Sequence, residues 1–317
     1  MRLLVTGGSG FLGGYVLDEA VRRGHECVAL ARSSEARRRV AAHGATPLDG
    51  DLNDGAAPLG RSFAGARCDA LVNLASLGFG HAPAIVAATL AAELDRAVFV
   101  STTAITTRLP AASKAVRMAA EETIRSSGLR WTILRPTMIY GAPGDRNLSR
   151  LLMLLARARR ELRPGGLPLV LPVPGGGSRL QQPVHVADVA AAVLSAVERP
   201  AARMHCYDIA GPEPVTFAEL LRTCCAAIGC RACLIPVPLA PVIALTRCYE
   251  RSARQPKFRA EQWQRLAEDK AFPINAAGRD LNYAPRPFID GIHAEADALG
   301  LASGKRQVQV RGWGSKW

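Results

Sequence analysis

Apolar runs and amphipathic segments alternate along the first 140 residues of the chain. Strands are predicted where the chain is continuously apolar, at 2–6, 26–31, 45–48, 70–75, 97–101 and 131–135. Helices are predicted between them, at 11–23, 34–42, 84–94 and 113–126. Apolar strands separated by helices indicate a parallel sheet that is covered on both faces.

The pattern changes after Gly141, where clusters of Gly and Pro divide the chain into irregular pieces. Helices are predicted in this half at 148–162, 184–197 and 216–228, and strands at 206–210 and near 233–235. Thr216 and Glu219 have the spacing of a capping box at the start of the third helix. The last third is predicted to be helical and loop-like.

The composition is that of a folded protein. The 317 residues are 49% hydrophobic and 21% charged, which excludes a disordered chain and provides for a large core. No apolar run is long enough to span a bilayer, and we expect no leader segment, since the first predicted strand begins at residue 2. We therefore expect a cytoplasmic protein.

The formal net charge is +13, and 35 of the 40 basic residues are arginine. Such a bias is typical of GC-rich codon usage, or it creates a field that attracts polyanions such as nucleotides and acidic lipid surfaces. No nucleic-acid-binding motif accompanies the arginines, so specific nucleic-acid binding is not expected.

Four cysteines are spaced closely enough to suggest a metal or redox site. Cys230 and Cys233 have C-x-x-C spacing, and Cys224 and Cys225 lie just upstream. The same positions fall on a predicted helix and a short strand, where small apolar residues serve equally well. We interpret them as structural thiols and expect no metal.

A glycine-rich turn, Thr6-Gly-Gly-Ser-Gly-Phe-Leu-Gly13, joins the first strand to the first helix. Gly7, Gly10 and Gly13 have the spacing that lets the backbone and a helix N-terminus approach a pyrophosphate. The strand-turn-helix context predicts a dinucleotide site of the Rossmann type, with Phe11 and Leu12 as part of it.

The end of the second strand distinguishes between two dinucleotides. No carboxylate stands there to bind a ribose 2′-hydroxyl; Arg32 and Ser33 follow the strand instead. A guanidinium can bind a 2′-phosphate in a bidentate manner, and a serine hydroxyl can add a hydrogen bond. We therefore expect NADP(H) in preference to NAD(H). The alternative is that Arg32 is a solvated arginine at a strand end.

Several motifs in order resemble the short-chain dehydrogenase/reductase superfamily, in its extended and atypical branches, which include NAD-dependent epimerase/dehydratase enzymes. The resemblance covers roughly residues 1–240. The motifs are TGGSGFLG at 6–13, GDL at 50–52, NLA at 73–75, VSTTA at 100–104, SK at 113–114, LRPTMIYG at 134–141 and QPVHVADVA at 182–190. The resemblance implies cofactor contacts by Asp51, Leu52, Leu74, Ala75, Pro136 and Ile139.

The catalytic set of that superfamily is a Ser or Thr, a Tyr and a Lys, with the Tyr four residues before the Lys. The resemblance makes Thr103 the hydroxyl that orients the substrate oxygen and Lys114 the lysine beside the nicotinamide ribose. Pro110 stands where the tyrosine is expected, so the proton donor is not assigned. Substitutes are Tyr140, His185 and Lys114 itself. Packing also suits Tyr140, and a structural hydrogen bond also suits His185.

The substrate side is predicted from a few polar positions. Arg146 and Asn147 precede the helix at 148–162 and either face a phosphate or form a helix cap with solvated arginines. Tyr140, Gln182 and His185 belong to the matching motifs and are assigned to the substrate. The Leu/Arg pattern of the helix at 148–162 either covers a core or makes weak contact with a membrane surface.

We expect an α/β protein, with a Rossmann-type doubly wound parallel sheet and a smaller C-terminal α+β substrate lobe. The NAD(P)-binding domain is predicted at 1–145, with 184–210 returning to it. The substrate lobe is predicted at 146–183 and 211–295, and a flexible basic tail at 296–317.

The predicted function is that of an NAD(P)H-dependent oxidoreductase or a sugar-nucleotide epimerase/dehydratase-like enzyme. Hydride transfer would occur at a carbonyl or hydroxyl carbon of a small-molecule substrate. Phosphorylated and nucleotide-linked substrates are among the candidates. The alternative is a non-catalytic NADP(H)-binding structural or regulatory protein, because the usual tyrosine is absent. An oligomer is compatible with both.

Overall fold

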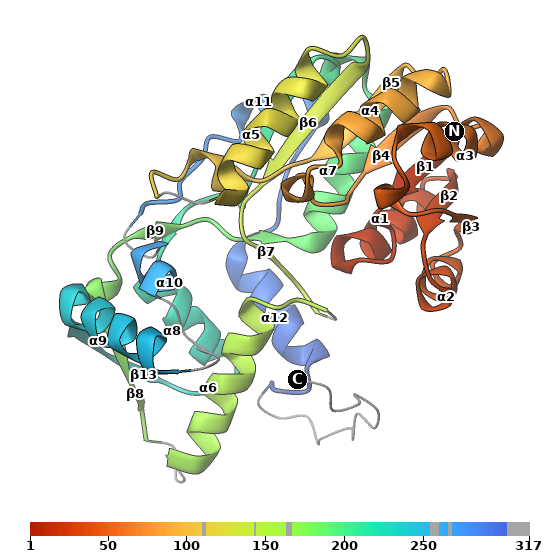
Figure 1. Cartoon of the computed structure of the whole chain (residues 1–317). Helices are drawn as coiled ribbons and strands as arrows, with labels where there is room; N and C mark the ends of the chain where they lie inside the picture. The colour runs from red at the N-terminus through yellow and green to blue at the C-terminus, as the bar shows by residue number, and fades with distance from the viewer. Residues whose placement is uncertain (110–111, 143, 163–166, 254–259, 266–267, 303–317) are drawn as a thin grey trace. The chain divides into compact units, whose positions relative to one another are not determined.

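The computed structural model describes residues 1–109, 112–142, 144–162, 167–253, 260–265 and 268–302 (Figure 1). The chain forms two compact units. The first comprises residues 1–139, 182–214 and 268–286, and the second comprises residues 140–181, 215–267 and 287–317. The segment 268–286, which the sequence analysis assigned to the substrate lobe, thus belongs to the first unit.

A seven-stranded sheet is the centre of the first unit, with strand order β11-β6-β5-β4-β1-β2-β3. All neighbouring strands are parallel. The strands are β1 (Arg2–Thr6), β2 (Glu26–Ala31), β3 (Thr46–Asp49), β4 (Ala70–Asn73), β5 (Arg96–Val100), β6 (Arg130–Pro136) and β11 (His205–Ile209). The order reverses between β1 and β4, and at such a point a doubly wound sheet opens a crevice for a ligand.

Helices cover both faces of this sheet (Figure 1). They are α1 (Phe11–Arg22), α2 (Ser34–Ala42), α3 (Ala56–Ala66), α4 (Ala82–Ala91), α5 (Ala112–Arg125), α7 (Val186–Glu198) and α11 (Asn275–Leu281). Alternate side chains of β1 enter opposite cores: Leu3 packs with α1, α7 and α11, and Leu4 packs with α3, α4 and α5. The predicted Rossmann-type doubly wound sheet is confirmed.

The second unit contains short strand pairs and five helices among its described residues. Strands β8 (Leu169–Pro174) and β13 (Ala232–Val237) are parallel, and β9 (Leu180–Gln181) and β12 (Val215–Thr216) are antiparallel. The helices are α6 (Leu148–Leu162), α8 (Phe217–Ala227), α9 (Leu239–Ser252), α10 (Ala260–Arg265) and α12 (Phe288–Ala298). The remaining pair joins β7 (Ile139–Tyr140) and β10 (Val184–His185).

Local sequence signals define several of these boundaries. The predicted capping box is present, since Thr216 accepts from the Glu219 N–H and the Glu219 carboxylate accepts from the Thr216 N–H. Ser33 caps α2 by accepting from the Ala36 N–H at 3.2 Å. Within the described part of the chain, none of the helices has the length and apolar character needed to cross a membrane.

Candidate functional site

The glycine-rich turn lies directly against the loop that follows β4. Gly7 has φ +75°, and a Cβ atom at this position would lie 2.7 Å from the backbone nitrogen of Ala75. A Cβ atom at Gly13 would lie 2.3 Å from the carbonyl oxygen of Gly8. Both positions therefore require glycine, one for the turn and its close approach to a neighbouring strand end, the other for tight packing of α1 on the turn.

The N-terminus of α1 has the properties of an anion site. Gly10 is its N-cap residue in extended conformation, and none of the described side chains caps the helix. The first turn contains no acidic residue. Its backbone N–H groups and the positive end of the helix dipole therefore suit a pyrophosphate. Phe11 and Leu12, at the start of the helix, are half-buried.

A buried hydrogen-bonded pair fixes the wall opposite the turn. The Thr6 hydroxyl donates to the Asn73 side-chain oxygen at 2.6 Å, and the Asn73 amide donates to the Ala75 carbonyl at 3.1 Å. The Leu74 N–H donates to the Thr6 carbonyl at 2.9 Å. These bonds hold Leu74 and Ala75 next to the glycine-rich turn. A dinucleotide bound at the turn would contact these two residues. Sequence analysis noted Asn73 only as part of a motif and missed its pairing with Thr6.

The end of β2 presents a cation to solvent. The Arg32 side chain is 72% exposed, and its Nη1 lies 3.8 Å from Oδ2 of Asp51. Two predicted cofactor residues that lie 19 positions apart are thus neighbours, and Leu52 begins the 3-10 helix Leu52–Asp54 beside them. The Ser33 hydroxyl accepts the capping bond of α2. It keeps its own proton to donate to a phosphate.

Thr103 lies on the turn after β5, and Lys114, on α5, bonds to the end of this turn. Thr103 begins the 3-10 helix Thr103–Thr106, is 8% exposed, and donates to the Pro136 carbonyl at 3.3 Å. Nζ of Lys114 donates to the Thr107 carbonyl at 2.6 Å. The backbone that carries Thr103 therefore also positions the Lys114 ammonium. Pro110 lies outside the described residues.

An acidic residue that sequence analysis missed supports this turn. Glu268 accepts from the Thr107 hydroxyl at 2.5 Å and from the Arg108 N–H at 2.8 Å. Burial tends to raise the pKa of Glu268, but these bonds and the nearby Lys270 ammonium hold it below its ordinary value. Glu268 lies about 160 residues along the chain from its partners, so no local pattern indicated the contact.

The other predicted residues of the first unit make structural hydrogen bonds. Gln182 donates to the Gly211 carbonyl at 2.7 Å and accepts from the Phe272 N–H at 2.7 Å, so both ends of its amide have partners. His185 caps α7 by accepting from the Ala187 N–H at its Nδ1. Burial, and then the Arg286 guanidinium, lower the pKa of His185 to about 4 against the effect of Asp188.

Three predicted residues belong to the second unit. Tyr140 is 1% exposed, stacks edge-on against Phe288 and donates to its carbonyl at 3.5 Å. Asp145 caps α6 by accepting from the N–H groups of Asn147 and Ser149, while the Arg146 and Asn147 side chains are exposed. This geometry matches the predicted helix cap, and it leaves the substrate roles of these residues as predictions.

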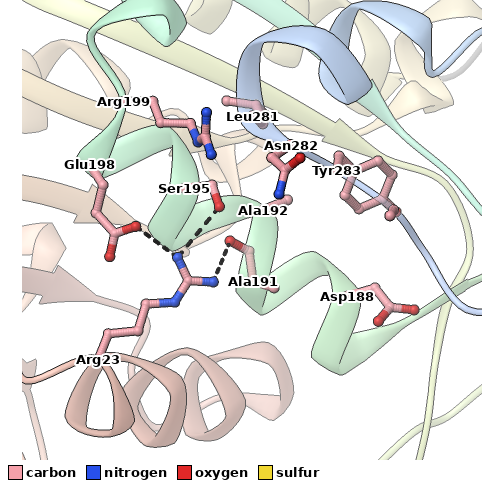
Figure 2. Close-up of a pocket in the computed structure, with 11 residues that line it drawn as sticks. Arg23, Asp188, Ala191, Ala192, Ser195, Glu198, Arg199, Leu281, Asn282 and Tyr283 are labelled. Carbon is pink, nitrogen blue, oxygen red and sulfur yellow. Dashed lines mark hydrogen bonds and ion pairs between the residues drawn. The ribbon is translucent and has the colours of Figure 1, made fainter.

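A separate pocket of the first unit has a volume of about 300 Å³ and includes none of the predicted site residues. Its Arg23 guanidinium donates to Glu198, to the Ser195 hydroxyl and to the Ala191 carbonyl (Figure 2). These bonds tie α1 to α7, so we interpret this pocket as part of the helix packing.

A family model described as NAD(P)H-binding matches residues 7–151, the stretch that contains the glycine-rich turn, Arg32, Thr103 and Lys114. The chain is 28% identical to a 4-hydroxy-2-methyl-3-oxo-4-farnesyl-3,4-dihydroquinoline-1-oxide ketoreductase of Stigmatella aurantiaca, over 90% of this chain and 92% of that protein. It is also 28% identical to a 2-alkyl-3-oxoalkanoate reductase of Stenotrophomonas maltophilia, over 92% of this chain and 96% of that protein.

Solved structures share the fold. The protein gox2253 has a TM-score of 0.73 at 21% identity, covering 94% of this chain and 98% of its own. UDP-glucose 4-epimerase of Thermus thermophilus, in complex with NAD, has a TM-score of 0.68 at 22% identity, covering 95% and 99%. The resemblance seen in the motifs is thus confirmed: residues 7–151 match an NAD(P)H-binding family model, and the fold of the chain is that of the solved epimerase-type structures.

Proposed function

We propose that the chain is an NAD(P)H-dependent ketoreductase that reduces the keto group of a small 3-oxo substrate. The observation that carries the proposal is the placement of the Lys114 ammonium on the turn that bears Thr103. Two relatives that align over at least 90% of the chain are named as reductases of 3-oxo compounds. These names do not favour the alternative of a non-catalytic NADP(H)-binding protein.

The dinucleotide, when bound, supplies the hydride for the carbonyl carbon. The glycine-rich turn binds its pyrophosphate, and the wall formed by Leu74 and Ala75 orients it. The Thr103 hydroxyl donates a hydrogen bond to the substrate oxygen in place of its bond to the Pro136 carbonyl. Lys114 is the proton donor, since the alternatives are engaged elsewhere: Tyr140 is buried against Phe288, and His185 is neutral and caps a helix.

For the cofactor, we propose NADPH rather than NADH. Arg32 is exposed and 3.8 Å from Asp51, a distance at which the pair is weak. A 2′-phosphate offers Arg32 a stronger, bidentate partner, and the Ser33 proton adds a donor. Fluorescence titration should show tighter binding of NADPH than of NADH. In Arg32→Asp the preference should reverse, and equal affinities in the native protein would contradict it.

The function is tested by following NADPH oxidation with a 2-alkyl-3-oxoalkanoate. The nucleotide-sugar comparison follows reduction of NADP⁺ with UDP-glucose, because that sugar has hydroxyls to oxidise and no keto group to reduce. Lys114→Met should lower kcat by 10²–10⁴-fold, the usual contribution of a positioned acid. NADPH affinity, measured separately by fluorescence, should fall much less, which distinguishes a proton donor from a ribose anchor. Arg61→Met is the matched control, because it removes an exposed cation of the same unit on α3, which carries none of the predicted site residues.

Stoichiometric NADPH binding without turnover on either substrate class would contradict the ketoreductase proposal and favour the non-catalytic alternative. Full activity in Lys114→Met would leave the ketoreductase in place and show that another group donates the proton.

A further inference from the structure

Helix α9 presents apolar side chains to solvent along one face. Pro241, Ala244, Leu245, Cys248 and Tyr249 recur at the spacing of one helical face, and all are exposed. Leu245 is 77% exposed and Tyr249 is 40% exposed. No residue of α9 is buried, although more than half of its sequence is apolar. A helix of a folded unit ordinarily turns such a face inward.

The strand pair β8–β13, which leads into α9, also has apolar side chains exposed on one face. Cys233 pairs with Val170, and Ile235 pairs with Pro172, so these four side chains share one face of the β8–β13 ribbon. All four are exposed, with Val170 at 38% and Ile235 at 49%. Strand β13 ends at Val237 and α9 begins at Leu239, so consecutive elements carry the two apolar faces.

The second unit as a whole is rich in positive charge. The second unit has 19 of the 40 basic residues but only 8 of the 27 acidic ones, a net charge of +11 out of +13 for the chain. Arg247 and Arg251 of α9 are exposed, and so is Arg231, which directly precedes β13. Glu250, the one acidic residue in the α9 sequence, accepts from the Ala260 N–H at the start of α10.

We propose that the exposed face of α9, together with the outer face of the β8–β13 ribbon, docks on the surface of a bilayer that contains anionic lipids. The apolar side chains would enter the boundary between headgroups and acyl chains, and the arginines would bind lipid phosphates. An anionic bilayer is favoured over a neutral one, because each arginine near an anionic leaflet adds to the affinity. This proposal does not rest on the ketoreductase function.

Binding is measured by co-sedimentation of the full-length protein with vesicles of phosphatidylglycerol and phosphatidylcholine, and with vesicles of phosphatidylcholine alone, at 0.15 M salt. We expect binding to the mixed vesicles only. Leu245→Asp should lower the partition coefficient at least tenfold, since it removes the most exposed apolar side chain of the face. Arg247→Gln with Arg251→Gln should lower it about thirtyfold.

The matched control is Leu154→Asp on α6, where a leucine of the same unit is 63% exposed. It should bind as the native protein does, and thermal melts should show all variants folded. The proposal is overturned if the native protein does not bind mixed vesicles, or if Leu154→Asp weakens binding as much as Leu245→Asp. It is also overturned if light scattering shows that Leu245→Asp converts a dimer to a monomer, because the face would then join two copies.

Discussion

Each unit buries one glutamate almost completely, and the two environments are opposite. Glu121 of the first unit is 1% exposed and accepts from Ser101 at 2.6 Å, from Arg125 at 2.9 Å and from the guanidinium of Arg135. Glu295 of the second unit is 2% exposed and accepts from the Ser149 hydroxyl at 2.5 Å. Its other oxygen has no hydrogen-bond partner among the described residues.

This comparison shows that a positive net charge of a unit does not supply a cation to each carboxylate buried in it. The second unit has most of the chain's excess positive charge. The charged group that acts on Glu295 is nevertheless another carboxylate, Asp145. Burial first, and then Asp145, raise the pKa of Glu295 to about 7, although the Ser149 bond opposes this. In the first unit the bond that Arg135 donates to Glu121 raises the pKa of Arg135, as expected of a stable pair.

The largest effect is expected from Glu121→Gln. The amide keeps the shape of the side chain but removes the charge to which the half-buried Arg135 donates its hydrogen bonds. Breaking a buried pair in this way costs about 3–5 kcal/mol of unfolding free energy. Denaturant unfolding at pH 7 measures it. Glu122→Gln is the control, because the neighbouring side chain is exposed and should change stability by no more than about 0.5 kcal/mol. A loss below about 1 kcal/mol in Glu121→Gln would show that the pair contributes little.

A smaller effect of the opposite sign is expected from Glu295→Gln. The ordinary pKa of 4.5 applies in the unfolded chain and about 7 in the folded one. Between these values the folded state holds an extra proton, so native stability falls as the pH rises from about 4.5 to 7. The glutamine has no such proton to lose, so at pH 8 the variant should be more stable by up to about 3 kcal/mol.

The measurement is the unfolding free energy of both proteins from pH 5 to pH 8. The difference should be smallest near pH 5, at about 1 kcal/mol, and grow toward pH 8. Asp290→Asn, an exposed carboxylate on the same helix α12, should leave the pH profile unchanged. A profile of Glu295→Gln that runs parallel to the native one would show that Glu295 is ionised in the folded chain throughout.

Sequence patterns predicted the first unit better than the second. The strands at 2–6 and 26–31 and the helices at 34–42 and 148–162 have their predicted bounds. They are marked by continuous apolar runs or by strong amphipathic periodicity, both of which are local signals. Helix α3 (Ala56–Ala66) was not predicted, because Pro58, Gly60 and Gly65 are residue types that usually mark turns.

The candidate site divides in the same way. The glycine-rich turn could be predicted because its backbone conformation requires glycine at Gly7, whatever the rest of the chain does. The supports of the site could not, since Thr6 with Asn73 and Thr107 with Glu268 pair across 67 and 161 positions. The exposed face of α9 was also not foreseen, because an apolar helix pattern does not reveal which side faces solvent.

The smallest effect, and the finest test of the comparison, is expected from Ser149→Ala. Ser149 is 4% exposed, and its hydroxyl donates to Glu295. This bond lowers the pKa of the Glu295 carboxyl. Without it the pKa of Glu295 should rise further, and the fall in stability should extend to higher pH. A hydrogen bond to a charged group contributes about 1.5–3 kcal/mol, and one to a neutral group about 1 kcal/mol. Ser149→Ala should therefore cost about 1 kcal/mol at pH 5 and up to about 1–2 kcal/mol more at pH 8.

In the Glu295→Gln background the cost should not depend on pH, because no charge remains for the hydroxyl to bind. A pH-dependent cost in that background would point to Asp145 as the titrating carboxylate.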